Sequence, residues 1–233
     1  MNGGTFYSVG VGPGDPELLT RKAERILREC PVIAAPQPRD GRMLALEIAQ
    51  QAVDLSGKTV VPLSFPMSPE PERRVRAHRA AADSLRPYLD AGTPVAMLNL
   101  GDPTIYATAS YVRELLAASG YETVIIPGVP SFCAAAAALG LTLVEGDETL
   151  TIRPGPEPRG PESRVLMKSG RHLPEVLAAL AQDGSLSRTA LAANVGLPGE
   201  QLLRDLSPEE DLSGTGYFAT LIIPPERGEE EDG

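Results

Sequence analysis

The stretch that decides the fold is Phe6-Tyr-Ser-Val-Gly-Val-Gly-Pro-Gly-Asp-Pro-Glu-Leu-Leu-Thr-Arg-Lys-Ala23. Its apolar beginning, residues 6–11, is typical of a strand, and a turn rich in glycine and proline follows it. Thr20 then predicts the N-cap of a helix over residues 21–28. Glycines at the end of a strand let a ligand or a second strand approach the backbone more closely than a Cβ atom would allow. We therefore expect a strand–turn–helix unit with a close approach at its turn.

The glycine spacing in this stretch is not that of a dinucleotide-binding fingerprint. Pro13 and Pro16 interrupt the pattern, and no third glycine opens the helix at the required distance. An oxidoreductase on a dinucleotide-binding fold is therefore the weakest of the candidate functions.

Two further turn motifs repeat the same logic later in the chain. Leu100-Gly-Asp-Pro-Thr-Ile-Tyr106 and Pro127-Gly-Val-Pro-Ser-Phe132 each follow an apolar strand and precede a helix. In the simplest interpretation Asp102 and Ser131 only cap the turns and helices that they begin. In open α/β sheets, however, ligands collect at the carboxyl ends of strands, where such turns lie. Both interpretations stay open on spacing alone.

Short apolar strands alternate with longer helical stretches along the whole chain, which is typical of an α/β fold. The predicted strands cover 6–11, 32–35, 59–63, 95–100, 123–126, 149–152, 164–168, 189–194 and 216–223. The predicted helices cover 19–29, 43–54, 71–91, 105–119, 131–139, 172–183 and 198–203. We expect two α/β domains, residues 1–122 and 123–225, and a solvated, disordered acidic tail over 226–233.

Composition excludes several classes of protein. The chain has 233 residues, of which 42% are hydrophobic and 22% charged, and so it can bury a full core. A net charge of −10 without a long basic stripe argues against nucleic acid as the partner. No apolar run spans a bilayer and no signal peptide precedes the fold, so we expect a cytoplasmic protein without a membrane partner. Cys30 and Cys133 predict buried, reduced thiols, and with two histidines no metal site is expected.

The three turn motifs together resemble, in order and approximate spacing, those of the tetrapyrrole (corrin/porphyrin) methyltransferases, which depend on S-adenosylmethionine. Later blocks agree with the same family: Val165-Leu-Met-Lys168, Asn194-Val-Gly-Leu-Pro-Gly-Glu200 and Tyr217-Phe-Ala-Thr-Leu-Ile-Ile223. The resemblance covers nearly the whole chain except the acidic tail. Phe65-Pro-Met-Ser68 and Glu145-Gly-Asp-Glu148 point to the subgroup that methylates C-20 of precorrin-2 in cobalamin biosynthesis.

This resemblance implies the two-domain tetrapyrrole methylase fold, a homodimer, and a methyl donor bound in the cleft between the domains. The implied reaction moves a methyl group from S-adenosylmethionine to C-20 of precorrin-2 or cobalt-factor II, leaving S-adenosylhomocysteine. We predict Asp102 and Tyr106 as the catalytic residues, with Asp102 in an electrostatic or positioning role. The residues carried over as donor-binding are Pro13, Leu100, Gly101, Asp102, Ile105, Tyr106, Ser131, Phe132, Met167, Asn194, Val195, Ala219 and Thr220.

A tetrapyrrole substrate carries carboxylate arms, so a protein of net charge −10 needs local positive charge to bind it. Arg39 and Arg42, in the loop after the second predicted strand, are the predicted substrate-binding residues. The cluster Arg73, Arg74, Arg76 and Arg79 fits a solvated helix face better than a binding site. By residue type Asp102, Tyr106, Glu148 and His172 are all candidates for a proton-accepting base, and the sequence does not choose among them.

Alternative functions stay open within and beyond this family. The nearest is methyl transfer on the same fold to another corrin position, to uroporphyrinogen III, or in the manner of the diphthamide and ribosomal-RNA methylases. The lack of a basic surface signature disfavours the RNA option. A non-catalytic module that binds a donor or nucleotide differs from all of these in turning over no methyl group.

Overall fold

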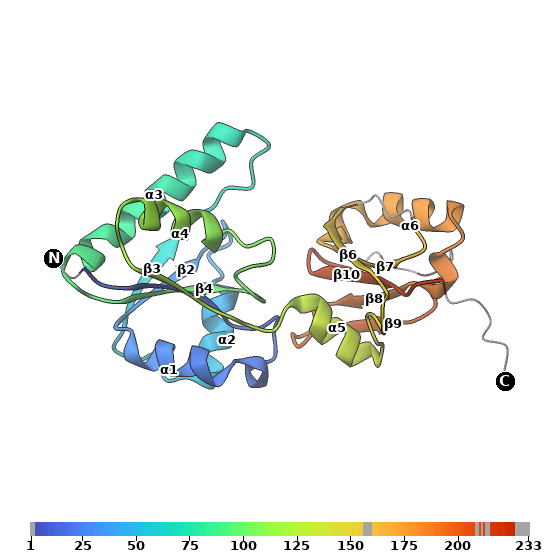
Figure 1. The fold of residues 1–233 in the computed structure, drawn as a ribbon, viewed down its shortest axis with the longest axis horizontal. Coiled ribbons are helices and arrows are strands. Elements are labelled where there is room, and N and C mark those ends of the chain that lie inside the picture. Colours follow the sequence, from blue (N-terminus) through green and yellow to red (C-terminus); the bar gives the residue numbers. More distant parts are fainter. Residues whose placement is uncertain (1–2, 156–159, 208–209, 211, 213–214, 227–233) are drawn as a thin grey trace. The chain divides into compact units, whose positions relative to one another are not determined.

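The chain folds as two α/β units, each built around its own five-stranded sheet (Figure 1). The computed structural model describes residues 3–155, 160–207, 210, 212 and 215–226. The first unit ends at Pro130 and the second begins at Ser131. The division therefore lies later than the predicted one after residue 122, because the strand at 123–126 pairs with the first strand of the chain.

The first unit alternates strands and helices in the order predicted. Its elements are β1 (Phe6–Gly10), the 3-10 helix η1 (Pro16–Leu18), α1 (Arg21–Glu29), β2 (Val32–Pro36), α2 (Leu44–Ala52), β3 (Thr59–Leu63), α3 (Pro71–Asp90), β4 (Val95–Asn99), α4 (Ala109–Ala118) and β5 (Thr123–Ile126). All neighbouring strands run parallel in the order β3-β2-β4-β1-β5. The carboxyl ends of all five strands therefore lie at one edge of the sheet.

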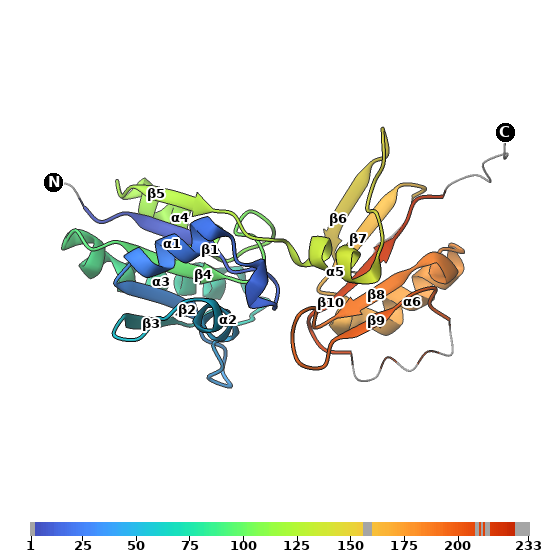
Figure 2. The ribbon, with the colours of Figure 1, turned by 90° about the horizontal axis from the view of Figure 1, so that it is seen from below.

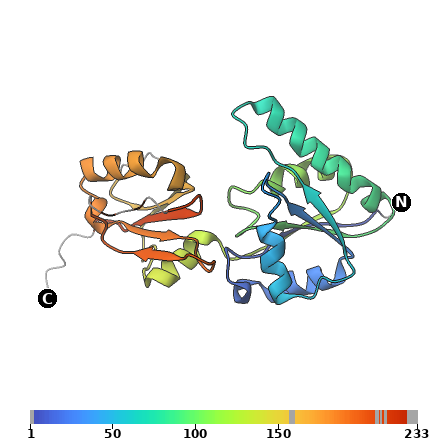
Figure 3. The ribbon, with the colours of Figure 1, turned by 180° about the vertical axis from the view of Figure 1, so that it is seen from behind.

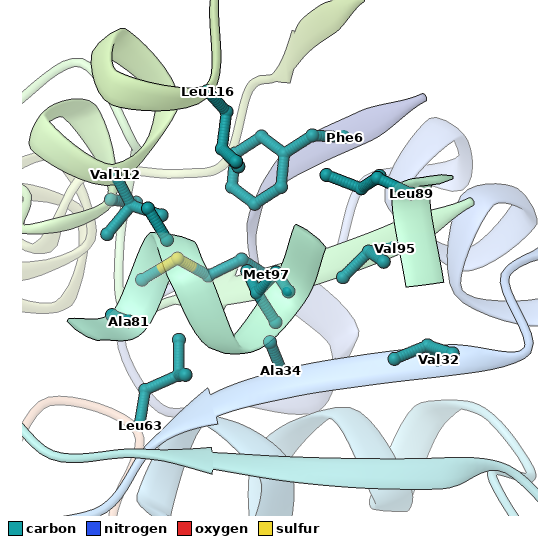
Figure 4. Packing of buried hydrophobic residues seen from close by; sticks show 13 residues of the cluster. Phe6, Val32, Ala34, Leu63, Ala81, Leu89, Val95, Met97, Val112 and Leu116 are labelled. Carbon is teal, nitrogen blue, oxygen red and sulfur yellow. The ribbon is translucent and has the colours of Figure 1, made fainter. Parts of the chain in front are cut away.

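Helices cover both faces of this parallel sheet, as buried strands of this kind require. In the views of Figures 1 and 3, α3 and α4 lie on one face and α1 and α2 on the other. Figure 4 shows how Phe6 and Met97 of the sheet meet Leu89 of α3 and Leu116 of α4 in one buried cluster. This core fixes the sheet, and with it the strand ends that carry the glycine motifs.

The helix that follows the first glycine motif begins where the sequence predicts. The hydroxyl of Thr20 accepts a hydrogen bond from the backbone N–H of Ala23 at 3.1 Å, which is the N-cap geometry. Residues 16–18 form the separate short helix η1, because the Asp15 carboxylate accepts the N–H of Glu17 at 2.8 Å. The helix predicted over 19–29 thus begins two residues later, at Arg21, and the 3-10 turn η1 precedes it.

The second unit has a mixed sheet with the order β6-β7-β10-β8-β9 (Figure 2). Its elements are α5 (Ser131–Leu139), β6 (Leu150–Pro154), β7 (Ser163–Met167), the 3-10 helix η2 (Ser169–His172), α6 (Leu173–Gln182), the 3-10 helix η3 (Leu186–Arg188), β8 (Ala190–Ala193), β9 (Gln201–Leu203) and β10 (Ala219–Ile223). β6 runs parallel to β7, and the other pairs are antiparallel. α5 packs against β8, β9 and β10, while α6 covers the opposite face of the sheet (Figure 1).

Two predicted helices differ from the structure. The prediction over 198–203 is wrong: Gln201–Leu203 form strand β9, because after the bend at Pro198 and Gly199 the chain returns to pair with β8. The helix predicted over 105–119 begins only at Ala109, since Tyr106 adopts a left-handed backbone with φ 47° that no helix continues through.

The acidic tail predicted over 226–233 is described only at its first residue. Glu226 is held to the second unit: its N–H donates to the carbonyl of Pro161 at 3.0 Å, and its carboxylate accepts from Arg188 at 3.2 Å. Residues 227–233 lie outside the described part of the chain. Among the residues described, no helix combines the length and apolar character needed to cross a membrane.

Candidate functional site

Three glycines join the carboxyl ends of the central strands of the first unit by direct backbone contact. A Cβ atom on Gly10 would lie 2.6 Å from both the carbonyl oxygen of Gly101 and the nitrogen of Gly128. A Cβ atom on Gly128 would lie 2.3 Å from the same Gly101 oxygen. These distances leave no room for any side chain. The ends of β1, β4 and β5 therefore meet as bare backbone, and the glycines serve approach of strand to strand.

The loop after β1 is also fastened to the turn after β4. The N–H of Gly101 donates to the carbonyl of Gly12 at 2.8 Å, forming an isolated bridge between the two loops. Both glycines have a positive φ, 75° at Gly12 and 67° at Gly101, which glycine adopts without steric cost. Pro13, predicted to contact the donor, directly follows this bridge. The first two motifs are thus one structural unit at the sheet edge.

The carboxylate of Asp102 joins the second motif to the third. One oxygen, Oδ1, accepts hydrogen bonds from the backbone N–H of Thr104 at 2.7 Å and from its hydroxyl. The other oxygen, Oδ2, accepts the N–H of Gly128 at 2.9 Å across the sheet edge. The side chain is buried, with 8% of the residue exposed. Asp102 therefore caps its own turn, as its spacing suggested, and also holds the turn after β5.

The remaining residues predicted on the β4–α4 turn lie on the same edge. Leu100 is fixed through its carbonyl, which accepts the side-chain amide of Asn99 at 2.7 Å. Ile105 is half-buried, and Tyr106 is 46% exposed with its left-handed backbone. A non-glycine residue in that conformation costs of order 1–3 kcal/mol and is concentrated at functional sites. Tyr106 is therefore an unusual residue in structure as well as in predicted role.

Ser131 and Phe132 are the first two residues of the second unit and open α5. Phe132 is buried at 6% exposure, whereas Ser131 is half-buried. Sequence predicted Ser131 as the N-cap, and the structure places it as the first residue of the helix.

The later predicted residues gather at one edge of the second sheet. Thr220 pairs with Met167 across β10 and β7, and Ala219 pairs with Ala193 across β10 and β8. The N–H of Asn194 donates to the carbonyl of Phe218 at 3.1 Å, which extends the β8–β10 pairing by one bond. Residues far apart in the sequence, on three strands, are thus neighbours here.

Two residues at this edge have left-handed backbones, Lys168 with φ 58° and Asn194 with φ 52°. Asn194 shapes the turn before β9, since its side-chain amide donates to the carbonyl of Gly199 at 3.2 Å. Val195, half-buried, follows directly. Burial lowers the pKa of the Lys168 ammonium below its ordinary value. Lys168 and the 43% exposed ring of Phe218 were not among the predicted site residues, and the strained backbone of Lys168 becomes visible only in the fold.

The predicted substrate arginines lie in the β2–α2 loop, on the carboxyl edge of the first sheet. Arg42 forms an ion pair with Glu47 at 2.8 Å, and that hydrogen bond raises the pKa of the guanidinium. Arg39 is exposed on the same loop. Of the other candidate bases, His172 is exposed and contacts Glu175 at 2.9 Å, a pair within one helical turn at the surface.

Comparison with known proteins agrees with this architecture. The profile of the tetrapyrrole (corrin/porphyrin) methylases matches residues 5–209. The precorrin-2 C(20)-methyltransferase of Sinorhizobium sp. is 31% identical over 239 residues, covering 95% of both chains. The cobalamin biosynthesis protein CobIJ of Mycobacterium tuberculosis is 32% identical over 238 residues, covering 95% of this chain but 46% of that protein. This chain thus spans about half the length of that relative.

A solved structure gives the same result for the fold. The uroporphyrin-III C-methyltransferase of Thermus thermophilus, complexed with S-adenosyl homocysteine, superposes with a TM-score of 0.68 at 25% identity. The match covers 95% of this chain and 97% of that one. With the two sheets, the glycine-joined strand ends and the match over residues 5–209, the chain belongs to the tetrapyrrole (corrin/porphyrin) methylase family.

Proposed function

We propose that this protein transfers a methyl group from S-adenosylmethionine to C-20 of precorrin-2, in its metal-free or cobalt-bearing form. The observation that carries the proposal is the edge of the first sheet, where three glycines and the Asp102 carboxylate hold three loops together. The 31% identity to the Sinorhizobium enzyme over 95% of both chains supports the choice of substrate and position.

The residues present fit an adenosyl donor. Adenine binds between apolar walls with backbone hydrogen bonds, while the ribose and the amino-acid end need a few fixed polar partners. At one edge of the second sheet the apolar residues Met167, Val195 and Ala219 lie beside the polar residues Asn194 and Thr220. In the first unit, Leu100, Gly101 and Ile105 lie on the turn after β4, at the carboxyl ends of the strands, where ligands of open α/β sheets bind.

The donor would supply an activated methyl group: a carbon–carbon bond to C-20 replaces the sulfur–methyl bond, S-adenosylhomocysteine leaves, and the proton that C-20 carried is released to solvent. The protein's part is then to hold the reacting atoms in line and to exclude water. Asp102 is a positioning residue in this scheme, because its oxygens are engaged with Thr104 and Gly128. Tyr106, whose side chain is exposed at the same edge, is the residue that we place nearest the substrate.

The proposal is tested by anaerobic incubation of the protein with S-adenosylmethionine and enzymatically made precorrin-2, with mass spectrometry of the tetrapyrrole. One added methyl group, placed at C-20 by carbon NMR, is the expected result. Parallel incubations with the cobalt-bearing substrate and with uroporphyrinogen III distinguish the metal form and the alternative acceptor. Donor binding without methyl gain on any of the three would refute this activity and leave a donor-binding module.

We further propose that the protein works as a homodimer in the cytoplasm. The proposed dimer rests on the resemblance of the motifs to the family. Cys30 and Cys133, which form no disulfide in the described part of the chain, fit a reducing compartment. Light scattering coupled to size-exclusion chromatography tests the proposed dimer, with twice the 24.6 kDa chain mass as the expected result. A particle of the chain mass at micromolar concentration would contradict it.

A further inference from the structure

An apolar stripe on α3 continues beyond the part of the helix that the sheet covers. Leu85 and Leu89 are fully buried against the sheet, and Ala82 is 1% exposed. The same helical spacing leads to His78 and Val75, nearer the start of the helix. Val75 is 47% exposed, and Figure 1 shows the first turns of α3 standing clear of the sheet. The helix thus presents an apolar face to solvent.

Two aromatic rings meet this exposed part of the stripe. His78 stacks on Tyr111 of α4 with ring centroids 4.6 Å apart and planes within 5°. His78 also contacts Phe65, in the loop after β3, with ring centroids 5.9 Å apart. Tyr111 remains 54% exposed, and burial together with Arg74 lowers the pKa of His78 below its ordinary value. The imidazole is therefore neutral near pH 7, and the rings of Phe65, His78 and Tyr111 together form a mainly apolar surface.

This aromatic surface, defined as Phe65, Val75, His78 and Tyr111, lies on the functional side of the first unit. The β3–α3 loop and the first turns of α3 and α4 all follow the carboxyl ends of parallel strands. The β4–α4 turn with Asp102 and Tyr106 follows the same edge.

Arg74 flanks the aromatic surface, whereas its sequence neighbours Arg73 and Arg76 do not. Arg74 precedes His78 by one helical turn, and its Nη1 donates to the carbonyls of Ser68 and Pro69 at 2.7 and 3.0 Å. These bonds fix the loop that carries Phe65, and they involve one of the three guanidinium nitrogens. Around the helix axis, Arg73 lies about 140° and Arg76 about 160° from His78, on the solvated face. Arg76 is paired there with Glu72 at 3.8 Å.

We infer that the aromatic surface, with Arg74 at its rim, binds the tetrapyrrole: the macrocycle stacks on the outer face of Tyr111, whose inner face His78 covers, and a carboxylate arm meets Arg74. The inference rests on the proposed function and names the residues that recognise its substrate. A large conjugated ring matches exposed aromatic side chains, and an anionic arm matches a positioned guanidinium in a protein of net charge −10. None of the four residues of the aromatic surface belongs to the predicted donor set.

The test measures equilibrium binding of uroporphyrin III, a stable carboxylated tetrapyrrole, by absorbance in the presence of S-adenosylhomocysteine. Loss of one stacked ring in Tyr111→Ala is expected to weaken binding about three- to tenfold, whereas Tyr111→Phe keeps the ring and binds as the parent does. Arg74→Gln is expected to weaken binding by a similar factor. Arg73→Gln, the same charge change on the opposite face, and Val60→Ala, on exposed β3, are the matched controls and leave binding unchanged.

The outcomes separate this inference from the proposed function. If the parent methylates precorrin-2 and Tyr111→Ala leaves both the uroporphyrin affinity and the KM for precorrin-2 unchanged, the inference is overturned and the proposed function stands. If Tyr111→Ala weakens uroporphyrin binding while the parent adds no methyl group, the surface binds tetrapyrroles and the proposed reaction is wrong. A change of oligomeric state in Tyr111→Ala with unchanged affinity would assign the surface to a second copy of the chain and overturn the inference.

Discussion

At the scale of single residues, Gly10, Gly101 and Gly128 matter because of what they lack. The φ angles of Gly10 and Gly128 are not positive, so their own backbone conformation does not require glycine. Glycine is required at these two positions because neighbouring backbone atoms leave no room for a Cβ atom. Glycines required by close backbone contact can therefore be distinguished by experiment from glycines required by a positive φ.

We expect Gly128→Ala to destabilise the protein by about 1–3 kcal/mol or more, because the new Cβ atom would lie 2.3 Å from the Gly101 oxygen. Chemical denaturation checks this. Gly57→Ala is the control, since Gly57 has φ 76° but nothing within 4 Å of a Cβ atom, and its cost is about 1 kcal/mol. Equal losses for the two variants would show that backbone approach is not the constraint.

Asp102 provides a second prediction at this scale. Asp102→Asn keeps the size and the Oδ1 bonds to Thr104 but turns an N–H₂ group toward the N–H of Gly128. We expect a loss of about 1–3 kcal/mol in stability and a higher KM for the donor. Because Asp102 is a positioning residue, the pH dependence of kcat is expected to keep its shape. A pH profile that loses one limb in the variant would instead make Asp102 a proton acceptor.

The two thiols are predicted to differ in reactivity. Burial raises the pKa of Cys30 to about 11, and the residue is 1% exposed. Cys133 is half-buried, and burial raises its pKa as well. A thiol reagent at pH 8 is expected to modify Cys133 first and Cys30 only on unfolding. Mass spectrometry of the partly modified protein identifies the site, and early modification of Cys30 would contradict its burial.

At the scale of elements, the start of α1 depends on the hydroxyl group of Thr20, which makes two hydrogen bonds. Its hydroxyl accepts from Ala23 and donates to the carbonyl of Pro127 at 3.3 Å, in the turn after β5. We expect Thr20→Ala to cost about 1–2 kcal/mol, the usual value for a lost N-cap, by thermal or urea denaturation. Thr20→Ser, which keeps the hydroxyl, is the control and is expected to stay within about 0.5 kcal/mol of the parent. A full loss in the serine variant would locate the effect in the methyl group.

The elements also show which parts of the fold could be predicted from the sequence. The three strand–turn–helix motifs and the family were predicted correctly, because glycine, proline and capping residues act over a few positions. The short strand β9 was predicted as a helix, since its pairing with β8 is a tertiary contact that overrides local preference. For the same reason the sequence could not reveal that Gly10, Gly101 and Gly128 touch, or that His78 stacks on Tyr111. These contacts join positions separated by whole elements.

At the scale of the whole molecule, net charge and local charge act in opposite directions on an anionic ligand. The protein carries −10, which repels a carboxylated tetrapyrrole, whereas Arg74 attracts one. Raising salt from about 0.05 M to about 0.5 M screens both. We expect the Kd for uroporphyrin III to rise with salt, because the nearby guanidinium outweighs the distributed charge. The Arg74→Gln variant is expected to reduce this salt dependence, and Arg73→Gln to keep it. A Kd that falls with salt would show that the net charge dominates.

The position of β10 in the second sheet has a consequence for how the protein is made. This strand occupies the middle of the sheet and pairs with both β7 and β8, yet it follows all the other strands along the chain. During synthesis on a ribosome, the first unit has all its strands available while the second still lacks the strand that joins its two halves. We expect the nascent second unit to expose the apolar faces of β7 and β8 until Ala219–Ile223 emerge. That interval is when a chaperone would be needed most.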